Sequence, residues 1–170
     1  EGKPLEETLF FESRLKGKGD IAVGLVTGDI QKVMDVDVWV NSENTNMQMA
    51  RPFENSISGV IRYLGAEKDP QNNQISTDTI VDELKKKMGT DTSVDPASVL
   101  VTTSGEMLKS HRVKRIFHVA ANYGQVGQGY IPIDNVANCI VNALKVSVAD
   151  EESELRSILF PLMATRSRRG

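Results

Sequence analysis

Two apolar runs near the start of the chain are each followed at once by polar residues. The first, residues 22–27, ends before Asp29, and the second, residues 36–40, ends before Asn41. The first run is continuously apolar, as in a strand that is covered on both faces, whereas valines alternate with other residues in the second. We expect both to be central strands. Ligands of open α/β sheets bind beyond the carboxyl ends of strands, so both ends are candidate ligand contacts.

Further strands and helices follow in alternation along the chain. Helical spacing of apolar residues begins at Phe53, with Asn55 or Ser56 as the alternative caps, and recurs twice more. Such alternation predicts a three-layer α/β/α sandwich with a mixed, mostly parallel central sheet, formed by one domain over residues 1–170. The remaining predicted strands are residues 8–15, 99–103, 114–121 and 157–162, and the predicted helices are residues 53–64, 77–88 and 133–148.

The helix after Pro132 has the clearest apolar face. One face is held for about four turns by apolar residues at helical spacing: Ile133, Val136, Ala137, Ile140, Val141, Leu144 and Val148.

Composition narrows the class of protein without naming a function. The 170 residues are 39% hydrophobic and 25% charged with a net charge of −3, which argues against a nucleic-acid-binding role based on charge. No apolar run approaches the roughly 20 residues of a membrane span. One cysteine, Cys139, and two histidines, His111 and His118, predict neither a disulfide nor a metal site. A cytoplasmic location fits best, with a nuclear one as the alternative.

The ends of the sequence indicate a piece of a longer protein. It begins at Glu1 without a methionine and stops after a basic string that ends at Gly170. We expect this piece to be linked to further domains.

Four segments, in order, resemble the motifs of a macrodomain, the ADP-ribose-binding α/β/α module. They are VTGDI at 26–30, VWVNSEN at 38–44, IFHV at 116–119, and the final strand at 157–161 with its loop at 163–165. Their order and their places at element ends agree with the family from residue 20 onward. The resemblance implies the fold predicted above and an adenine-nucleotide ligand.

Two departures from the family pattern qualify what the resemblance implies. The family's glycine-rich segment, which carries a catalytic aspartate in many of its hydrolases, is replaced by residues 46–58, and Ile57 falls near the position of the aspartate. A macrodomain also continues with another strand and helix, so we expect a continuation beyond Gly170.

The resemblance assigns adenine to Asp29 and to the backbone N–H of Ile30, and the distal ribose to Asn44. Asn41 either contributes to ribose binding or braces the loop. The alternative for Asp29 is that it caps a short helix at 30–34. Asparagine at a strand end is also a common turn former.

The resemblance places phosphates at the amino end of the helix after residue 56 and at the last loop. The free N–H groups and dipole of a helix amino terminus favour an anion. The alternative is that Ser56 is an ordinary cap, Phe53 a core anchor and the terminal arginines solvated. The candidate contacts are Arg51, Ser56, Ile57 and Ser58, then Ala164, Thr165 and Arg166, with Ala121 and Asn122 at the rim.

Other residues that could carry chemistry have simpler explanations. The glycines at 124–129 lack the helix that a phosphate loop requires. We interpret His118, inside an apolar strand, as a satisfied core histidine, and Cys139 as a small apolar filler.

The sequence therefore predicts a binding module, a reader or sensor, for ADP-ribose or a related NAD-derived nucleotide, with no further cofactor. The ligand is either free or attached to an ADP-ribosylated macromolecule. The alternative is an ADP-ribosyl hydrolase in which Glu43 or Glu54 replaces the missing base. Binding of single-stranded RNA is disfavoured by the 5% aromatic content and the negative charge.

Overall fold

The computed structural model describes residues 8–15, 19–125, 129–150 and 154–163. The chain divides into two units, Glu1–Val33 and Met34–Gly170, and each is described by itself. The expectation of one domain over the whole chain stays a prediction.

The first unit contains a β-hairpin. β1 (Thr8–Leu15) pairs antiparallel with β2 (Gly19–Val26), so that Leu15 lies opposite Gly19. Among the described strands, β2 pairs with β1 alone, and the prediction of a central strand at residues 22–27 is wrong on this point. An apolar run specifies a strand but not its partner, and here the preceding strand is joined to it by only three residues.

The second unit is built on a five-stranded mixed sheet. Its order is β6-β7-β3-β9, with β8 also paired to β7. β3 (Val38–Asn44) runs parallel to both β7 (Arg115–Gln125) and β9 (Ile158–Leu159), whereas β6 (Val99–Thr103) and β8 (Gly129–Pro132) are antiparallel to β7. The three parallel strands lie together, and the mixed sheet confirms the predicted class.

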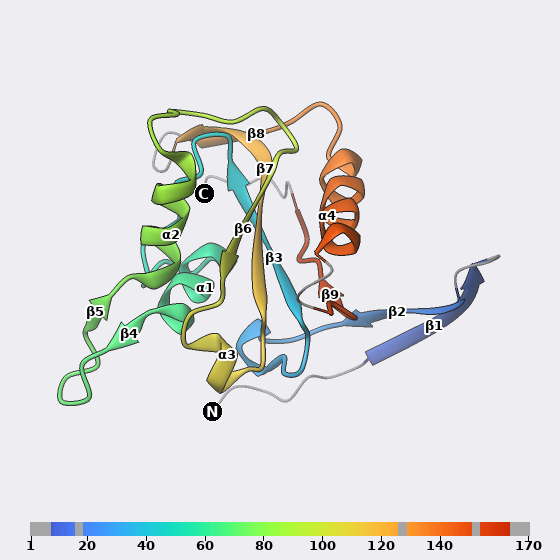
Figure 1. Cartoon of the computed structure of the whole chain (residues 1–170), viewed down its shortest axis with the longest axis horizontal. Helices are drawn as coiled ribbons and strands as arrows, with labels where there is room; N and C mark the ends of the chain where they lie inside the picture. The colour runs from blue at the N-terminus through green and yellow to red at the C-terminus, as the bar shows by residue number, and fades with distance from the viewer. Residues whose placement is uncertain (1–7, 16–18, 126–128, 151–153, 164–170) are drawn as a thin grey trace. The chain divides into compact units, whose positions relative to one another are not determined.

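Helices cover this sheet on two sides, as Figure 1 shows. α1 (Ile57–Gly65) contacts β3 and α2 (Thr79–Met88) contacts β6, whereas α4 (Ala137–Ala149) contacts β7 and β6 from the other side. Val38, Val40, Phe117 and Val119 form the core beneath α4 with its residues Cys139 and Ala143. The predicted three-layer α/β/α arrangement is therefore confirmed.

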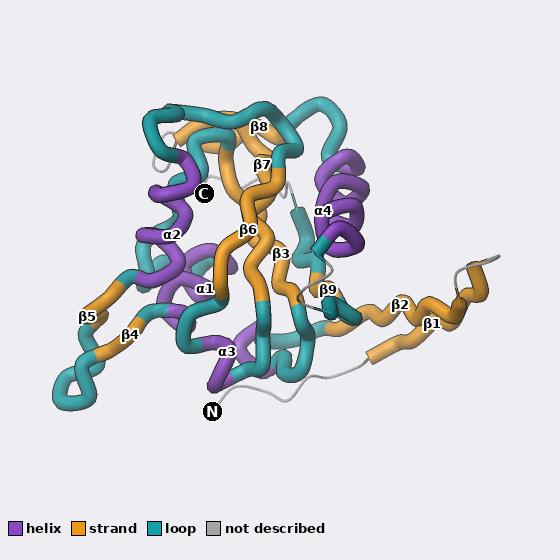
Figure 2. Tube along the Cα trace, viewed as in Figure 1, coloured by secondary structure: helices purple, strands orange, loops and turns teal. Residues whose placement is uncertain are grey.

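Short elements complete the second unit (Figure 2). β4 (Glu67–Lys68) and β5 (Ile75–Thr77) form an antiparallel ribbon that connects α1 to α2 along the chain, and α3 (Met107–Ser110) leads into β7. Within the described ranges, no helix combines the length and the apolar character that crossing a bilayer requires.

The apolar stripe found in the sequence lies on the exposed face of α4. Ile140 and Leu144 are exposed by 40% and 44%, and Val148 by 79%, whereas Cys139 and Ala143 are fully buried. The helix is apolar on more than one face, so spacing alone allowed two choices. The small side chains of Cys139 and Ala143 face the sheet.

Phe53 is not the core anchor that the alternative interpretation proposed. It lies before α1, outside the helix, and its side chain is 84% exposed. The helix begins only after Ser56, which leaves Phe53 in the irregular segment that precedes it.

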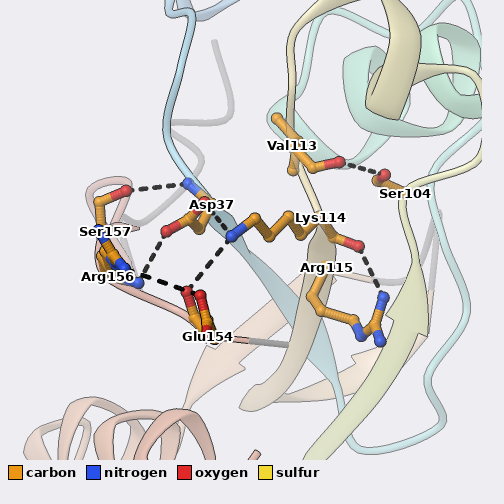
Figure 3. A network of polar contacts seen from close by, with 8 residues as sticks. All are labelled: Asp37, Ser104, Val113, Lys114, Arg115, Glu154, Arg156 and Ser157. Carbon is orange, nitrogen blue, oxygen red and sulfur yellow. Dashed lines mark hydrogen bonds and ion pairs between the residues drawn. The ribbon is translucent and has the colours of Figure 1, made fainter. Parts of the chain in front are cut away.

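Asp37 joins the amino-terminal end of β3 to the segment before β9 (Figure 3). Its Oδ2 accepts the N–H of Arg156 at 2.7 Å, its own N–H donates to Ser157 Oγ at 3.0 Å, and Lys114 Nζ lies 3.1 Å from Oδ1. Burial acts to raise the pKa of Asp37, but these hydrogen bonds and the Lys114 charge outweigh it, so the pKa lies below its usual value. Asp37 thereby holds β9 beside β3.

Candidate functional site

The carboxyl ends of β3 and β7 meet at one edge of the sheet. The pairing shifts register after Glu43, so that Asn44 lies opposite Asn122 and Ala121 is an extra residue on β7. Ala121 is buried in the core beneath α4, while Asn122 reaches the edge, where its Nδ2 lies 3.5 Å from Ser42 Oγ. Polar side chains from two parallel strands are therefore gathered at this edge.

The amino terminus of α1 faces the same edge. Ser56 caps the helix by accepting the N–H of Gly59 at 3.1 Å. A Cβ at Gly59 would lie 2.7 Å from the carbonyl oxygens of Arg51 and Glu54, so glycine lets the preceding loop fold back onto the first turn. The N–H groups of Ile57 and Ser58 have no hydrogen-bond partner within the described chain, which leaves two helix-end donors for a ligand.

A buried carboxyl group, Glu43, links β3 to α1. Its Oε1 accepts two hydrogen bonds of 2.6 Å, one from Asn41 Nδ2 and one from Ser58 Oγ. Ser58 Oγ in turn accepts the N–H of Ala50 at 3.1 Å. The two short bonds hold the carboxyl group in place, since one joins it to Asn41 of its own strand, β3, and the other joins it to Ser58 of α1.

Polar contacts continue from Glu43 into the core. Asn41 Nδ2 lies 3.3 Å from His118 Nδ1, and His118 Nε2 lies 3.0 Å from Thr102 Oγ1. Asn41, His118 and Thr102 are all buried. Both ring nitrogens of His118 therefore have partners, which agrees with the interpretation of a satisfied core histidine.

Burial shifts the pKa of both titratable groups in this network. It raises the pKa of Glu43 to about 8, although the hydrogen bonds from Ser58 and Asn41 and the Arg62 charge act in the opposite direction. It lowers the pKa of His118 to about 3. Both side chains are therefore largely neutral at pH 7.

A pocket of about 510 Å³ opens at this edge of the sheet. Asn44 is only 1% exposed; its Oδ1 accepts the N–H of Asn46 at 2.8 Å, but its Nδ2 has no partner in the described chain. An unpaired buried donor is costly unless a ligand or water satisfies it. The lining residues are Ser42, Glu43, Asn44, Gln48, Ala50, Glu54, Asn55, Ser56, Ile57, Ser58, Asn122, Tyr130, Pro161 and Leu162.

Five of the residues predicted to bind a ligand line this pocket. They come from three elements that are up to 78 positions apart in sequence, because Asn122 of β7 joins Asn44 of β3 and the α1 amino terminus. The structure brings these residues together, and their contact with a ligand stays a prediction. The five are Asn44, Ser56, Ile57, Ser58 and Asn122.

Three other predicted residues of the second unit lie elsewhere. Asn41 is fully buried, donates to Glu43 through Nδ2, and is not among the residues that line the pocket. Ala121 is turned into the core by the register shift. Arg51 is exposed and lines a different pocket.

Asp29 and Ile30 belong to the first unit. Asp29 caps the short helix η1 (Ile30–Lys32) by accepting the N–H of Gln31 at 3.0 Å, which is the alternative that the sequence left open. Their role in binding adenine stays a prediction. Ala164, Thr165 and Arg166 lie outside the described residues.

The second, larger pocket, of about 730 Å³, lies between the loop after β3 and α2. Its lining includes Arg51, Lys85 and Met88. Arg62, which also lines it, is already engaged by Asp78 at 2.6 Å and by the Ala50 carbonyl at 3.0 Å. We favour the smaller pocket as the functional site because it lies at the strand ends and contains unpaired donors.

The sequence did not indicate Tyr130 as a pocket residue, and it offered Glu43 as a possible base without placing it in the site. Tyr130 reaches the pocket from β8, and burial, followed by the charges of Glu43 and Glu54, raises its pKa. No local pattern indicated either contact, since both depend on long-range pairing. The described part of the chain contains no group of His, Cys, Asp or Glu residues that could hold a metal ion.

Comparison of the sequence with protein-family models found no match, and neither did comparison with curated proteins. The structure is similar to the macrodomain of Oceanobacillus iheyensis. One mutant of it is 16% identical, with a TM-score of 0.53 over 90% of this chain and 66% of that one. A second mutant, with ADPR, is 17% identical, with a TM-score of 0.54 over 88% of this chain and 68% of that one. The chain therefore has a macrodomain fold and spans about two thirds of the length of these structures.

Proposed function

We propose that this chain binds ADP-ribose or a related NAD-derived adenine nucleotide in the 510 Å³ pocket at the ends of β3 and β7. One observation carries the proposal: the buried Asn44 amide and the free N–H groups of Ile57 and Ser58 converge on one pocket without partners in the described chain. Such donors suit ribose hydroxyls and phosphate oxygens. The similar macrodomain structure with ADPR supports the same ligand class.

Within this proposal, the pocket acts as a reader or sensor rather than as a hydrolase. Ile57, near the family's aspartate position, is aliphatic and lines the pocket. Glu43 is held largely neutral at pH 7, which makes it a poor general base. Both observations favour binding without turnover.

Hydrolysis of an ADP-ribosyl bond is the second candidate. Two carboxyl groups, Glu43 and Glu54, line the same pocket, and Glu54 is exposed. An acid and a base on one pocket are what such a reaction requires.

Calorimetry with ADP-ribose, ADP and adenosine at pH 7 tests the binding proposal. We expect ADP-ribose to bind more tightly than adenosine, because the helix-end N–H groups are assigned to phosphate. Equal affinities for the two would refute that assignment, and no binding of ADP-ribose would refute the proposal. An assay for release of ADP-ribose from modified protein separates the two candidates, since a reader binds without turnover.

A further inference from the structure

One oxygen of the Glu43 carboxyl group accepts hydrogen bonds from the protein, and the other accepts none. Oε1 accepts both of the 2.6 Å hydrogen bonds, from Asn41 and Ser58. Oε2 accepts none within the described chain, and it is not among the buried polar atoms that lack a partner. It therefore keeps contact with solvent, and Glu43, only 4% exposed, has that contact through the pocket it lines.

The donors around Oε1 also fix where a proton on this carboxyl group must sit. Ser58 Oγ accepts the Ala50 N–H and so has its own hydrogen free to donate to Oε1, while Asn41 donates through Nδ2. With Oε1 occupied as an acceptor, the acid hydrogen belongs on Oε2 and points toward the pocket.

We infer that Glu43 contacts the bound ligand as a hydrogen-bond donor, through its Oε2–H, to an oxygen of an anionic nucleotide. This inference rests on the proposed function and names a ligand contact within the same pocket. None of the described lining residues is basic, so an anionic ligand here meets helix-end N–H groups and a neutral acid rather than a cation. An ionised Glu43 would instead repel the ligand.

The other titratable or charged groups that face Glu43 do not take over its role as a hydrogen-bond donor to the ligand. Arg62, on α1, is paired with Asp78 at 2.6 Å, and its charge acts to lower the pKa of Glu43. His118, on β7, is neutral, and burial raises the pKa of Tyr130, on β8, above its usual value. Glu54, in the loop before α1, is exposed at the pocket rim.

The inference makes binding depend on pH in one direction. With a pKa of about 8 for Glu43, only the neutral form binds, and the apparent Kd rises by about tenfold between pH 7 and pH 9. At pH 8.5 binding takes up about three quarters of a proton, because that fraction of the free protein is ionised. The diphosphate of ADP-ribose joins two sugars and has no ionisation in this range.

Calorimetry with ADP-ribose at pH 7.0, 8.0 and 9.0, repeated at pH 8.5 in two buffers of different ionisation enthalpy, tests the inference. We compare the wild-type protein with Glu43→Gln, whose amide keeps an accepting oxygen and a donating NH₂ group at every pH. Glu67→Gln is the matched control, since Glu67 is an exposed carboxylate on β4.

The expected result is a tenfold rise in Kd with proton uptake for the wild type and for Glu67→Gln, and a constant Kd without proton uptake for Glu43→Gln. A wild-type Kd that is constant from pH 7 to 9, or an equal rise in the Glu43→Gln protein, would overturn the inference and leave the proposed function standing. No binding by the wild type at any pH would overturn both. If the Glu43→Gln protein does not fold, the proton uptake of the wild type decides.

Discussion

Replacing Glu43 by glutamine should stabilise the protein at alkaline pH and leave it nearly unchanged at acid pH. The folded-state pKa of Glu43, about 8, lies above the 4.5 of an unperturbed carboxyl group. The folded protein therefore binds more protons than the unfolded chain between these values. Stability is fully present below the unfolded pKa and is lost as the pH rises toward the folded pKa. Glutamine has no such loss.

The magnitude follows from the size of the shift. Between pH 5.5 and pH 8.5 the wild type should lose about 3 kcal/mol that the Glu43→Gln protein keeps, since each pH unit within the window is worth about 1.4 kcal/mol. With a urea m-value of about 2 kcal/mol/M, the separation between the two unfolding midpoints should therefore grow by about 1.5 M from pH 5.5 to pH 8.5.

Urea unfolding of both proteins at pH 5.5 and 8.5, followed by circular dichroism, measures this difference. Other titrating groups affect both proteins equally, so the gap between the two curves isolates Glu43. A gap of the same size at both pH values would refute the argument, because it would mean that Glu43 ionises with an ordinary pKa.

Three further outcomes are expected. Asn44→Ala should weaken ADP-ribose binding at least tenfold in calorimetry, since its unpaired amide donor is lost; an unchanged Kd would exclude Asn44 from the site. Asp29→Ala should cost about 1.5–3 kcal/mol of binding free energy if Asp29 reads adenine, the range for a charged hydrogen bond, whereas a pure cap would leave Kd unaltered. Gly105→Ala should lower the free energy of unfolding, measured in urea, by more than Gly89→Ala. Both glycines have positive φ, but a Cβ at Gly105 would collide with the Gly65 carbonyl, whereas the space at Gly89 is open. Equal losses of unfolding free energy would contradict the packing argument.

The strands and helices of the second unit were largely predictable because their apolar spacing is local. The strand at residues 99–103 has the predicted bounds, and the helix predicted for residues 77–88 ends at Met88 as expected. The outward face of α4 was not predictable, since Ile140 and Ala143 satisfy helical spacing equally well. Which stripe is buried depends on how closely the helix approaches the sheet.

The candidate site was predictable only where it follows strand ends and helix starts. Asn44 and Ser56 occupy such positions and line the pocket. The burial and raised pKa of Glu43 could not be predicted from the segment VNSEN. The carboxyl group is bonded to Ser58, which lies fifteen positions away in sequence. The place of Asn122, rather than Ala121, at the edge depends on a register shift that no local pattern indicates.

Mapping the backbone amide signals during a titration with ADP-ribose tests the central claim most directly. A ¹H–¹⁵N correlation spectrum of the labelled chain reports each N–H separately, including the two at the α1 amino terminus. We predict that the largest shifts fall on Asn44, Ile57, Ser58 and Asn122, which line the 510 Å³ pocket. Shifts confined to residues around Lys85 and Met88, in the larger pocket, or no shifts at all, would contradict the account.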